Sequence, residues 1–255
     1  MVMVSMNLSA PPVTREHGSW AILFVPMILG IIPAPVIDIS ALMIAIAVSF
    51  LFMAYIPAEL LMRGDRTVNN YFWTLVLGGG GSASALYIML GYGRYWLPVF
   101  AAAAALLYML KVFIEKKRGK NLWSDNTGIL MLTLSAPAAR YATAGLMDST
   151  AIGLYIISAV YFVTGGIYVH LLIKGIKDSR AKFNGARVLL LCALAVLSML
   201  VWIYGWSMLP VFAPIFVFVF TGLFSAKERR PDFKKTGLQL LLHSFWFMAA
   251  VYIFL

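Results

Sequence analysis

Charged and amide side chains gather where one long apolar run ends. This cluster comprises Glu59, Arg63, Asp65, Arg66 and Asn69. Glu59, Arg63 and Arg66 have the spacing i, i+4 and i+7, so a helix would present all three on one face. Guanidinium groups bind phosphate or carboxylate well, and a carboxylate beside them can accept a proton. The cluster is therefore suited to holding an anion next to a proton acceptor.

A second cluster of the same design ends another apolar run. His170, Lys174 and Lys177 repeat the i, i+4 and i+7 spacing, with Asp178 adjacent and Arg187 further along the chain. Ammonium and guanidinium groups again suit an anion, and an imidazole can take up a proton near neutral pH. Two helix ends of matching design would therefore form one anion site if they lie on the same side of a bundle.

Glu59 and His170 differ from the other members because each lies three or more residues inside its apolar run. An ionisable residue costs ~2.5–3.5 kcal/mol near the bilayer centre and less near the ends, so it tends to face a cavity or a partner. We predict Glu59 and His170 as catalytic residues if the chain is an enzyme, and the neighbouring charged and amide residues as ligand-binding. Taken singly, the cations have a simpler interpretation as charges that reach water and orient the protein.

Two further places carry ionisable residues that we predict to bind a ligand. Glu16 and His17 precede the first apolar run, which puts an acid and a titratable ring at the membrane interface. The alternative there is a helix start anchored by Trp20. Arg140 lies well inside an apolar run, and Asp148 follows eight residues later. The Arg140 side chain either reaches outward to water or lines a polar cavity and holds an anion or a carboxylate partner.

The composition decides which elements must position these residues. The chain has 255 residues, of which 62% are hydrophobic and 12% charged, whereas soluble domains have about 45–50% apolar and about 25% charged residues. It is therefore an all-α polytopic membrane protein without room for a sizeable soluble domain. The net charge of +10 is accounted for by basic loops that fix orientation and meet anionic membrane lipids, so we predict no nucleic acid partner.

Nine apolar runs are long enough to cross a bilayer core of about 30 Å, which takes ~20 residues of helix. The predicted helices are 19–37, 41–62, 70–92, 96–114, 126–147, 151–173, 187–204, 207–226 and 237–255. Pro137 is expected to kink its helix because it lacks an N–H donor. The glycine run Gly78–Gly81 is expected to permit close helix contact, since small residues are enriched at such interfaces.

The basic residues predict the orientation of these helices. Eighteen of the twenty Lys and Arg residues flank the same ends of the alternating runs, with Arg94 on the other side and Arg140 within a run. The positive-inside rule then places the N-terminus in the cytoplasm and the C-terminus outside. We predict a cytoplasmic segment at 1–18 and one transmembrane domain at 19–255. Within it, two parallel four-helix halves, about 19–120 and 121–226, precede an extra helix at 237–255.

One family resemblance rests on the start of the first helix. The motif Arg15–Trp20 (REHGSW), followed by Pro26 and Gly30, resembles the YwiC-like integral membrane proteins of prokaryotes. The length and hydropathy agree along the whole chain. The resemblance implies a multi-pass protein of the prokaryotic cytoplasmic membrane, and it brings no activity with it.

A more distant resemblance is to the UbiA-type prenyltransferases, which are nine-helix bundles with a cytoplasmic-side pocket. Their active residues follow helices 2 and 6, and Lys177, Asp178, Gly185 and Arg187 match the second of those motifs. The first UbiA motif holds Mg²⁺-diphosphate through aspartates, where this chain has Glu59–Arg66. The resemblance implies a UbiA-like bundle and, for an enzyme, a transferase acting on an isoprenoid or lipid-linked substrate. The carboxylate pattern does not support a Mg²⁺ site, and the cofactor stays open.

The residues and the resemblances lead to one expected function and two alternatives. We expect a cytoplasmic-side pocket for an anionic amphipathic ligand, namely a prenyl diphosphate, an isoprenoid or a phospholipid. The first alternative is a secondary transporter for a small anion, which the prolines, the glycine run and Arg140 would fit. The second is a non-catalytic membrane partner of another assembly. The sequence leaves open the oligomeric state and whether the chain catalyses a reaction.

Overall fold

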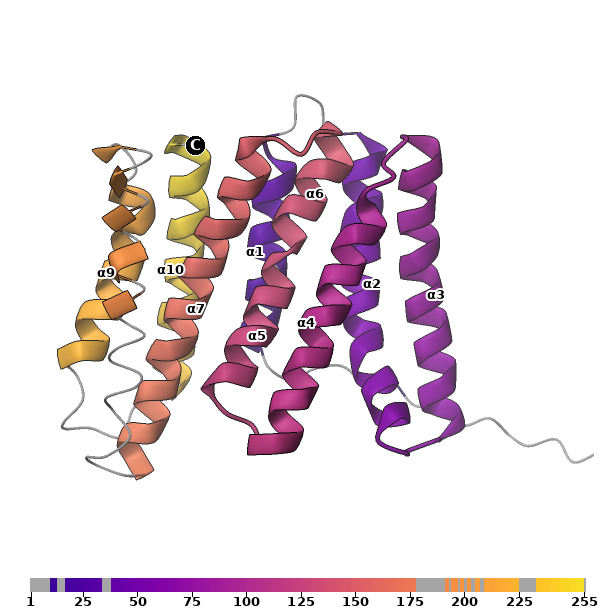
Figure 1. Ribbon diagram of the computed structural model, residues 1–255, viewed down its shortest axis with the longest axis horizontal. Coiled ribbons are helices and arrows are strands. Elements are labelled where there is room, and N and C mark those ends of the chain that lie inside the picture. The colour runs from indigo at the N-terminus through magenta and orange to yellow at the C-terminus, as the bar shows by residue number, and fades with distance from the viewer. Residues whose placement is uncertain are drawn as a thin grey trace, which may run out of the picture.

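The described part of the chain is helical apart from short connections. The computed structural model describes residues 10–12, 17–33, 38–177, 191–192, 194–196, 198–199, 201–202, 205–206, 209–224 and 233–254. The helices are α1 (His17–Ile31), α2 (Ile39–Met62), α3 (Val68–Gly91), α4 (Leu97–Arg118), α5 (Leu122–Thr133), α6 (Ser135–Ala144), α7 (Ser149–Lys177), α9 (Leu209–Phe224) and α10 (Phe233–Phe254). They run side by side along one common direction and form an upright bundle (Figure 1).

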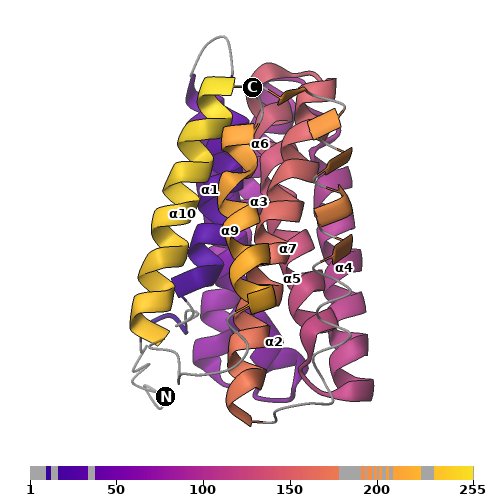
Figure 2. The same ribbon diagram turned by 90° about the vertical axis from the view of Figure 1, so that its left-hand side faces the viewer.

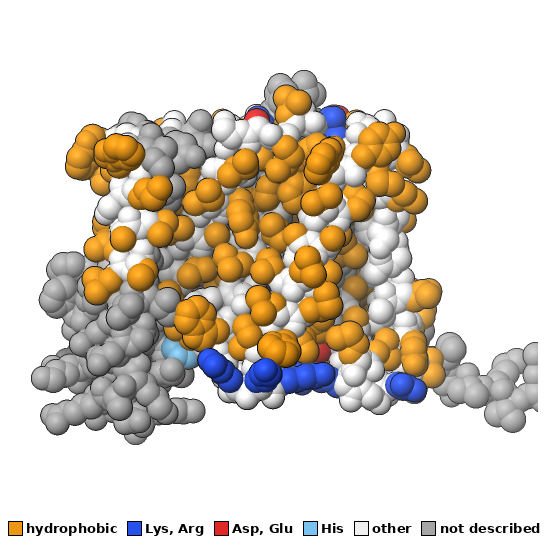
Figure 3. Space-filling model, viewed as in Figure 1, with side chains coloured by type: hydrophobic (Ala, Val, Ile, Leu, Met, Phe, Trp, Pro, Cys, Tyr) orange, Lys and Arg blue, Asp and Glu red, His pale blue; other side chains and the backbone are white. Residues whose placement is uncertain are grey.

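The bundle has the surface of a multi-pass membrane protein. Within the described residues, five helices are long and apolar enough to cross a membrane: α2, α3, α4, α7 over Ser149–His170 and α10 over Gly237–Phe254. Large apolar side chains such as Leu75, Leu90 and Leu106 point outward. Figure 3 shows apolar side chains over the middle of the visible face and Lys and Arg side chains along its lower edge. An apolar belt of this kind suits a hydrocarbon environment, where lipid rather than water covers the helices.

The basic side chains define one end of the bundle. Arg63 and Arg66 follow the C-terminal end of α2, and Lys116, Lys117 and Arg118 occupy the last turn of α4. We call this end, at the bottom of Figure 1, the basic end of the bundle. The last turn of α10 lies at the opposite end, which we call the far end (Figure 1).

The helix predicted at 126–147 corresponds to α5 and α6, which are separated only by a break at Leu134. Pro137 explains the break, since its ring clashes with the carbonyl of Thr133 and it donates no hydrogen bond there. Likewise, α1 ends at Ile31 and not at residue 37, because Pro33 cannot continue it. The predicted helices 187–204 and 207–226 lie partly outside the described residues.

Close contacts through glycine join the helices of the bundle. Gly81 of α3 faces α2, where an added Cβ atom would lie 3.0 Å from the carbonyl oxygen of Ala47. Gly30 of α1 faces α6 still more closely, because an added Cβ atom would lie 2.2 Å from the carbonyl oxygen of Ala136. Gly79, by contrast, has nothing within 4 Å of such an atom. Part of the predicted glycine run thus serves helix packing, as expected of small residues in membrane bundles.

The C-terminal helices complete a ring around one region of the bundle. α10 packs against α1 and α9, and α9 packs against α7, while α5 contacts both α4 and α7. Figure 2 shows α10, α9 and α7 side by side in front of the first helices. Tyr161 of α7 stacks on Phe247 of α10, with ring centroids 4.1 Å apart. This arrangement brings α7 and α10, distant in sequence from α1 and α2, to the walls of one cavity.

Candidate functional site

A half-open cavity of about 1580 Å³ lies between the helices and reaches the basic end of the bundle. Residues from α1, α2, α4, α5, α7 and α10 line it. The apolar part of its lining includes Ile22, Phe52, Ile129, Leu132 and Phe162. An apolar interior with a small number of polar groups is the usual make-up of a small-molecule site.

Charged side chains line the cavity where it meets the basic end. Six are charged and come from α2 and its C-terminal cap, α4, the α4–α5 link and α5, namely Glu59, Arg63, Lys111, Glu115, Lys120 and Asp125, and α7 adds the imidazole of His170. Those seven side chains form what we call the mouth of the cavity. At the other end of the lining are Tyr161 and Ser244, whose hydroxyl oxygens lie 3.3 Å apart. Tyr161 and His170 are nine residues apart on α7, so the lining extends about 13 Å along the helix axis.

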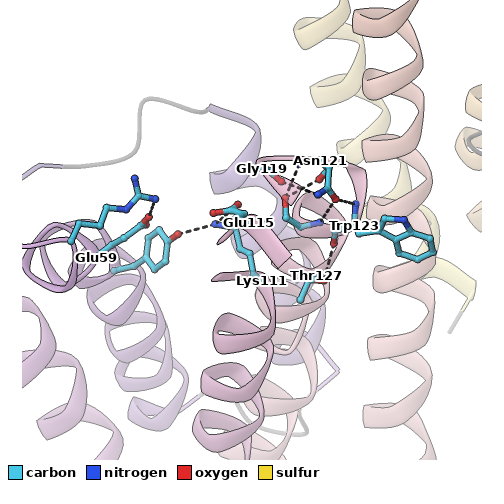
Figure 4. A network of polar contacts seen from close by, with 10 residues as sticks. Glu59, Lys111, Glu115, Gly119, Asn121, Trp123 and Thr127 are labelled. Carbon is cyan, nitrogen blue, oxygen red and sulfur yellow. Dashed lines mark hydrogen bonds and ion pairs between the residues drawn. The ribbon is translucent and has the colours of Figure 1, made fainter. Parts of the chain in front are cut away.

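A chain of polar contacts joins α2 to α4 at the mouth. The Arg63 guanidinium pairs with the Glu59 carboxylate one turn before it. Across the mouth, Lys111 Nζ donates a hydrogen bond to the Tyr55 hydroxyl at 2.9 Å, and it lies 3.6 Å from Glu115 Oε1. Figure 4 shows Glu59 on one side of this contact and Lys111 with Glu115 on the other. Cations and carboxylates therefore alternate across the mouth.

A helix cap fixes the turn that carries the remaining two charges of the mouth. The Asn121 side chain accepts hydrogen bonds from the backbone N–H groups of Trp123 (2.9 Å) and Ser124 (3.3 Å). The Ser124 hydroxyl accepts in return from the Asn121 backbone N–H at 3.1 Å, which completes a capping box. Figure 4 shows these contacts beside Lys111 and Glu115. Lys120 and Asp125 flank the cap, so the reversal from α4 into α5 positions both at the cavity.

The predicted residues of the first cluster divide between the cavity and the surface. Glu59 and Arg63 line the cavity, and only 18% of the Glu59 side chain is exposed. Asp65 and Arg66 are exposed in the link between α2 and α3, away from the lining. Asn69 lies in the first turn of α3 and is half-buried. The first cluster thus supplies one carboxylate and one guanidinium to the cavity.

The second cluster is described only in part. His170 lines the same cavity as Glu59, although the two residues belong to helices that are far apart in sequence. Lys174 and Lys177 lie in the last turns of α7, but their side chains are outside the described residues, as are Asp178 and Arg187. In the N-terminal motif, Gly18 lines the cavity, and His17 begins α1. The side chain of His17 and the whole of Glu16 are outside the described residues.

Arg140 lies apart from the cavity, near the far end of the bundle. Its Nη1 donates to the Pro33 carbonyl at 2.6 Å, and its Nη2 donates to Asp148 Oδ2 at 2.9 Å. Only 13% of the Arg140 side chain is exposed. Burial acts to raise the pKa of Asp148. The hydrogen bond and the charge of Arg140, together with a backbone hydrogen bond from Ala151, act in the opposite direction and outweigh burial, so the pKa lies below its usual range. Arg140 therefore has a carboxylate partner, and the cavity lining does not include it.

Replacing Asp148 by Asn is expected to destabilise the protein by about 1–3 kcal/mol, because Arg140 would lose a charge-assisted hydrogen bond in a half-buried position. Since the folded-state pKa of Asp148 is depressed, its contribution is present above the unfolded pKa of about 3.9 and is lost as the pH falls through the lower folded value. The unfolding temperatures of the unaltered protein and of Asp148→Asn, measured in detergent at pH 7 and below pH 4, check this. The two proteins should differ at pH 7 and converge below pH 4, and equal unfolding temperatures at pH 7 would refute the prediction.

Several residues of the mouth were not predicted as ligand-binding. Lys111 and Lys120 were expected only as orienting charges, and Glu115 and Asp125 were not singled out. A signal was present for Lys111, because it lies inside the predicted helix 96–114 with Glu115 at the i+4 position.

Within the described residues, no three His, Cys, Asp or Glu side chains gather closely enough to hold a metal ion.

Comparison with known proteins gives a consistent family match. The family model described as YwiC-like protein matches residues 13–140. The "Uncharacterized protein YwiC" of Bacillus subtilis is 24% identical over 171 residues, which cover 65% of this chain and 69% of that protein. An "Uncharacterized protein" of Haemophilus influenzae is 22% identical over 184 residues, which cover 71% of this chain and 76% of the relative. No solved structure matches.

Proposed function

This chain belongs to the YwiC-like protein family, and from its cavity we propose that it binds an amphipathic ligand with an anionic head group at the basic end of the bundle. The ligand class is a prenyl diphosphate, another isoprenoid or a phospholipid. The polar head lies among the charged side chains of the mouth, and the apolar chain lies between the helices. The bundle as a whole lies in the cytoplasmic membrane, with the mouth on the cytoplasmic side.

The observation that carries this proposal is the two-part lining of one cavity. Charged groups line its mouth, whereas Ile129, Leu132 and Phe162 line its interior. A ligand that is charged at one end and apolar at the other is complementary to such a lining. The volume of about 1580 Å³ exceeds the range of about 300–1,000 Å³ that is common for small-molecule sites. It therefore suits a ligand with a long chain better than a small soluble metabolite.

The anionic group of the ligand would interact with Lys111 and Arg63. Both cations line the cavity, and only 19% of the Lys111 side chain is exposed. Water screens a charge less when it is partly buried, so a hydrogen bond from Lys111 to a phosphate would be stronger than one at the surface. Glu59 and His170 are our proposed proton acceptors for any reaction at this site. The resemblance to UbiA-type prenyltransferases stays a prediction, as does the division into two parallel halves.

We do not propose a transporter, because its main support in the sequence has another explanation. Arg140 had indicated a polar group within the membrane, but it pairs with Asp148 near the far end. A transporter would need a substrate site that both sides of the membrane can reach in turn. The charged residues that line the cavity come from the basic end of the bundle.

Native mass spectrometry of the purified protein tests the proposal, followed by extraction and identification of the bound lipid. We expect about one phosphate-bearing amphipath per chain to survive washing in detergent. Adding the same compound to the stripped protein should raise its unfolding temperature, because a ligand that binds the folded state stabilises it. A protein that retains no lipid and whose unfolding temperature responds to neither farnesyl diphosphate nor phospholipid would contradict the proposal.

A further inference from the structure

From the balance of charge at the mouth, we infer that the head group of the ligand carries a primary ammonium group beside its phosphate. This inference rests on the proposed function and narrows its ligand class. Among the cavity-lining residues that the structure describes, there are three cations, Arg63, Lys111 and Lys120. There are also three carboxylates, which are Glu59, Glu115 and Asp125. Cations and carboxylates are therefore equal in number in the described part of the mouth, which also contains the His170 imidazole, in contrast to the basic end around it.

The pairing of these charges is unfavourable for a head group that is only anionic. Glu59 pairs with Arg63, and Glu115 lies 3.6 Å from Lys111 Nζ. At Arg63 and at Lys111, an incoming phosphate would have to share the cation with a carboxylate that repels it. Like charges that are brought together in a partly buried site oppose binding, and they are a common source of selectivity against a ligand.

A head group with both charges removes this conflict. Its phosphate can accept hydrogen bonds from Lys111 and Arg63, while its ammonium group donates to Glu59 or Glu115. A carboxylate has about four lone-pair positions and a lysine ammonium has three N–H donors. Lys111 uses one donor on the Tyr55 hydroxyl. The cation and the carboxylate of each pair can therefore still form hydrogen bonds with a ligand. The alternation of charge across the mouth then matches the alternation within the head group.

A primary ammonium group fits this mouth better than a quaternary one. Three N–H donors can reach carboxylate oxygens, whereas a trimethylammonium group has no donor and depends on open aromatic faces. The Tyr55 ring is already occupied, because Lys111 Nζ lies 5.3 Å from its centroid and the Tyr108 ring packs edge-on against it. At Tyr55, the mouth therefore favours an ammonium that donates hydrogen bonds over a methylated one.

Competition between lipids with identical chains tests this inference on the full-length protein in nanodiscs, with native mass spectrometry as the readout. The probes are phosphatidylethanolamine, its N-methylated analogue phosphatidylcholine, the ammonium-free phosphatidylglycerol, and farnesyl diphosphate. We expect phosphatidylethanolamine to be retained about tenfold better than the other three, since a charge-assisted hydrogen bond is worth about this factor. Glu59→Gln combined with Glu115→Gln should reduce its retention to the level of phosphatidylcholine while leaving phosphatidylglycerol no worse bound.

The possible results separate this inference from the proposed function. Equal or better retention of phosphatidylglycerol or farnesyl diphosphate would overturn the inference and leave the proposed function standing. Preference for phosphatidylethanolamine that survives both substitutions would also overturn it, because the mouth carboxylates would not be responsible. Failure of all four compounds to bind would overturn both proposals. Unfolding temperatures close to that of the unaltered protein would exclude loss of the fold as the cause of any change.

Discussion

Replacing Lys111 by Met is expected to weaken retention of the amphipathic ligand by about tenfold to a hundredfold. Lys111 projects from α4 into the mouth, with its Nζ 2.9 Å from the Tyr55 hydroxyl and 3.6 Å from Glu115 Oε1. Met keeps much of the apolar stem and removes the charge. A hydrogen bond to a charged group contributes about 1.5–3 kcal/mol, and 1.4 kcal/mol corresponds to a tenfold change in affinity. The loss of this contact, together with an uncompensated Glu115, gives the expected range.

Lys116→Met is the matched control for this substitution. Lys116 lies one turn further along α4 and is exposed, and the cavity lining does not include it. The two variants change the net charge equally, so a general effect of charge on lipid association would appear in both. The amount of bound lipid is measured by quantitative extraction from the unaltered protein, Lys111→Met and Lys116→Met. Similar losses in both variants would show that the surface charge, and not the mouth, retains the ligand.

Replacing Gly30 by Ala is expected to destabilise the bundle by about 1–3 kcal/mol or more, which is the usual cost of overpacking. The added Cβ atom would lie 2.2 Å from the carbonyl oxygen of Ala136 and 2.9 Å from the Cβ atom of Ala139. Both atoms belong to α6, and the nearer one is backbone, so no side-chain rotation relieves the contact. α1 and α6 would have to move apart, which would disturb the packing along their whole contact.

Gly79→Ala is the corresponding control on a different helix. An added Cβ atom at Gly79 has nothing within 4 Å, and Ala is a better helix former than Gly. We expect its unfolding temperature to equal or exceed that of the unaltered protein, while Gly30→Ala unfolds at a lower temperature. Equal unfolding temperatures of the two variants in detergent would show that α1 and α6 do not pack as closely as described.

The helices could largely be predicted from the sequence, because each one is a long apolar run between polar links. The bounds of α2 and α3 agree with the predicted 41–62 and 70–92 to within about two residues, which is the usual uncertainty of helix ends. The break at Leu134 was harder to predict. A proline within an apolar run can produce either a kink or a break, and the choice depends on the neighbouring helices. Here the Ser135 hydroxyl donates to the Leu23 carbonyl of α1 at 3.0 Å, next to the break.

The candidate site could be predicted only in part. Glu59 and His170 stand out because an ionisable residue inside an apolar run needs a polar surrounding, and both line the cavity. The residues that α4 contributes to the cavity could not be predicted in the same way. Lys111 reaches Tyr55 across 56 residues of sequence, and only the packing of the bundle brings these two side chains together. Charge patterns along one helix do not specify which helix lies opposite.

Arg140 illustrates a choice that the sequence left open. Residues eight apart on a continuous helix lie about 12 Å apart along its axis, so Arg140 and Asp148 could not pair within one helix. The structure ends α6 at Ala144 with a left-handed Gly145, whose φ is 78°. This residue turns the chain so that Asp148 returns beside Arg140, with Nη2 and Oδ2 2.9 Å apart. The geometry of a single turn therefore decided between an ion pair and an anion site.

Filling the cavity with a large side chain is the most direct test that it binds the ligand. Gly128 lines the cavity, and an added Cβ atom there meets only the Lys111 side chain, at 3.6 Å from its Cδ atom. Gly128→Trp would therefore extend a ring into the cavity beside Lys111, whereas Gly79→Trp would extend one into open space. The measurement is the number of amphipath molecules per chain in the two purified variants. We expect Gly128→Trp to retain at least about tenfold less than Gly79→Trp, in line with the loss of a charge-assisted contact. Equal retention in two folded variants would contradict the assignment of this cavity as the ligand site.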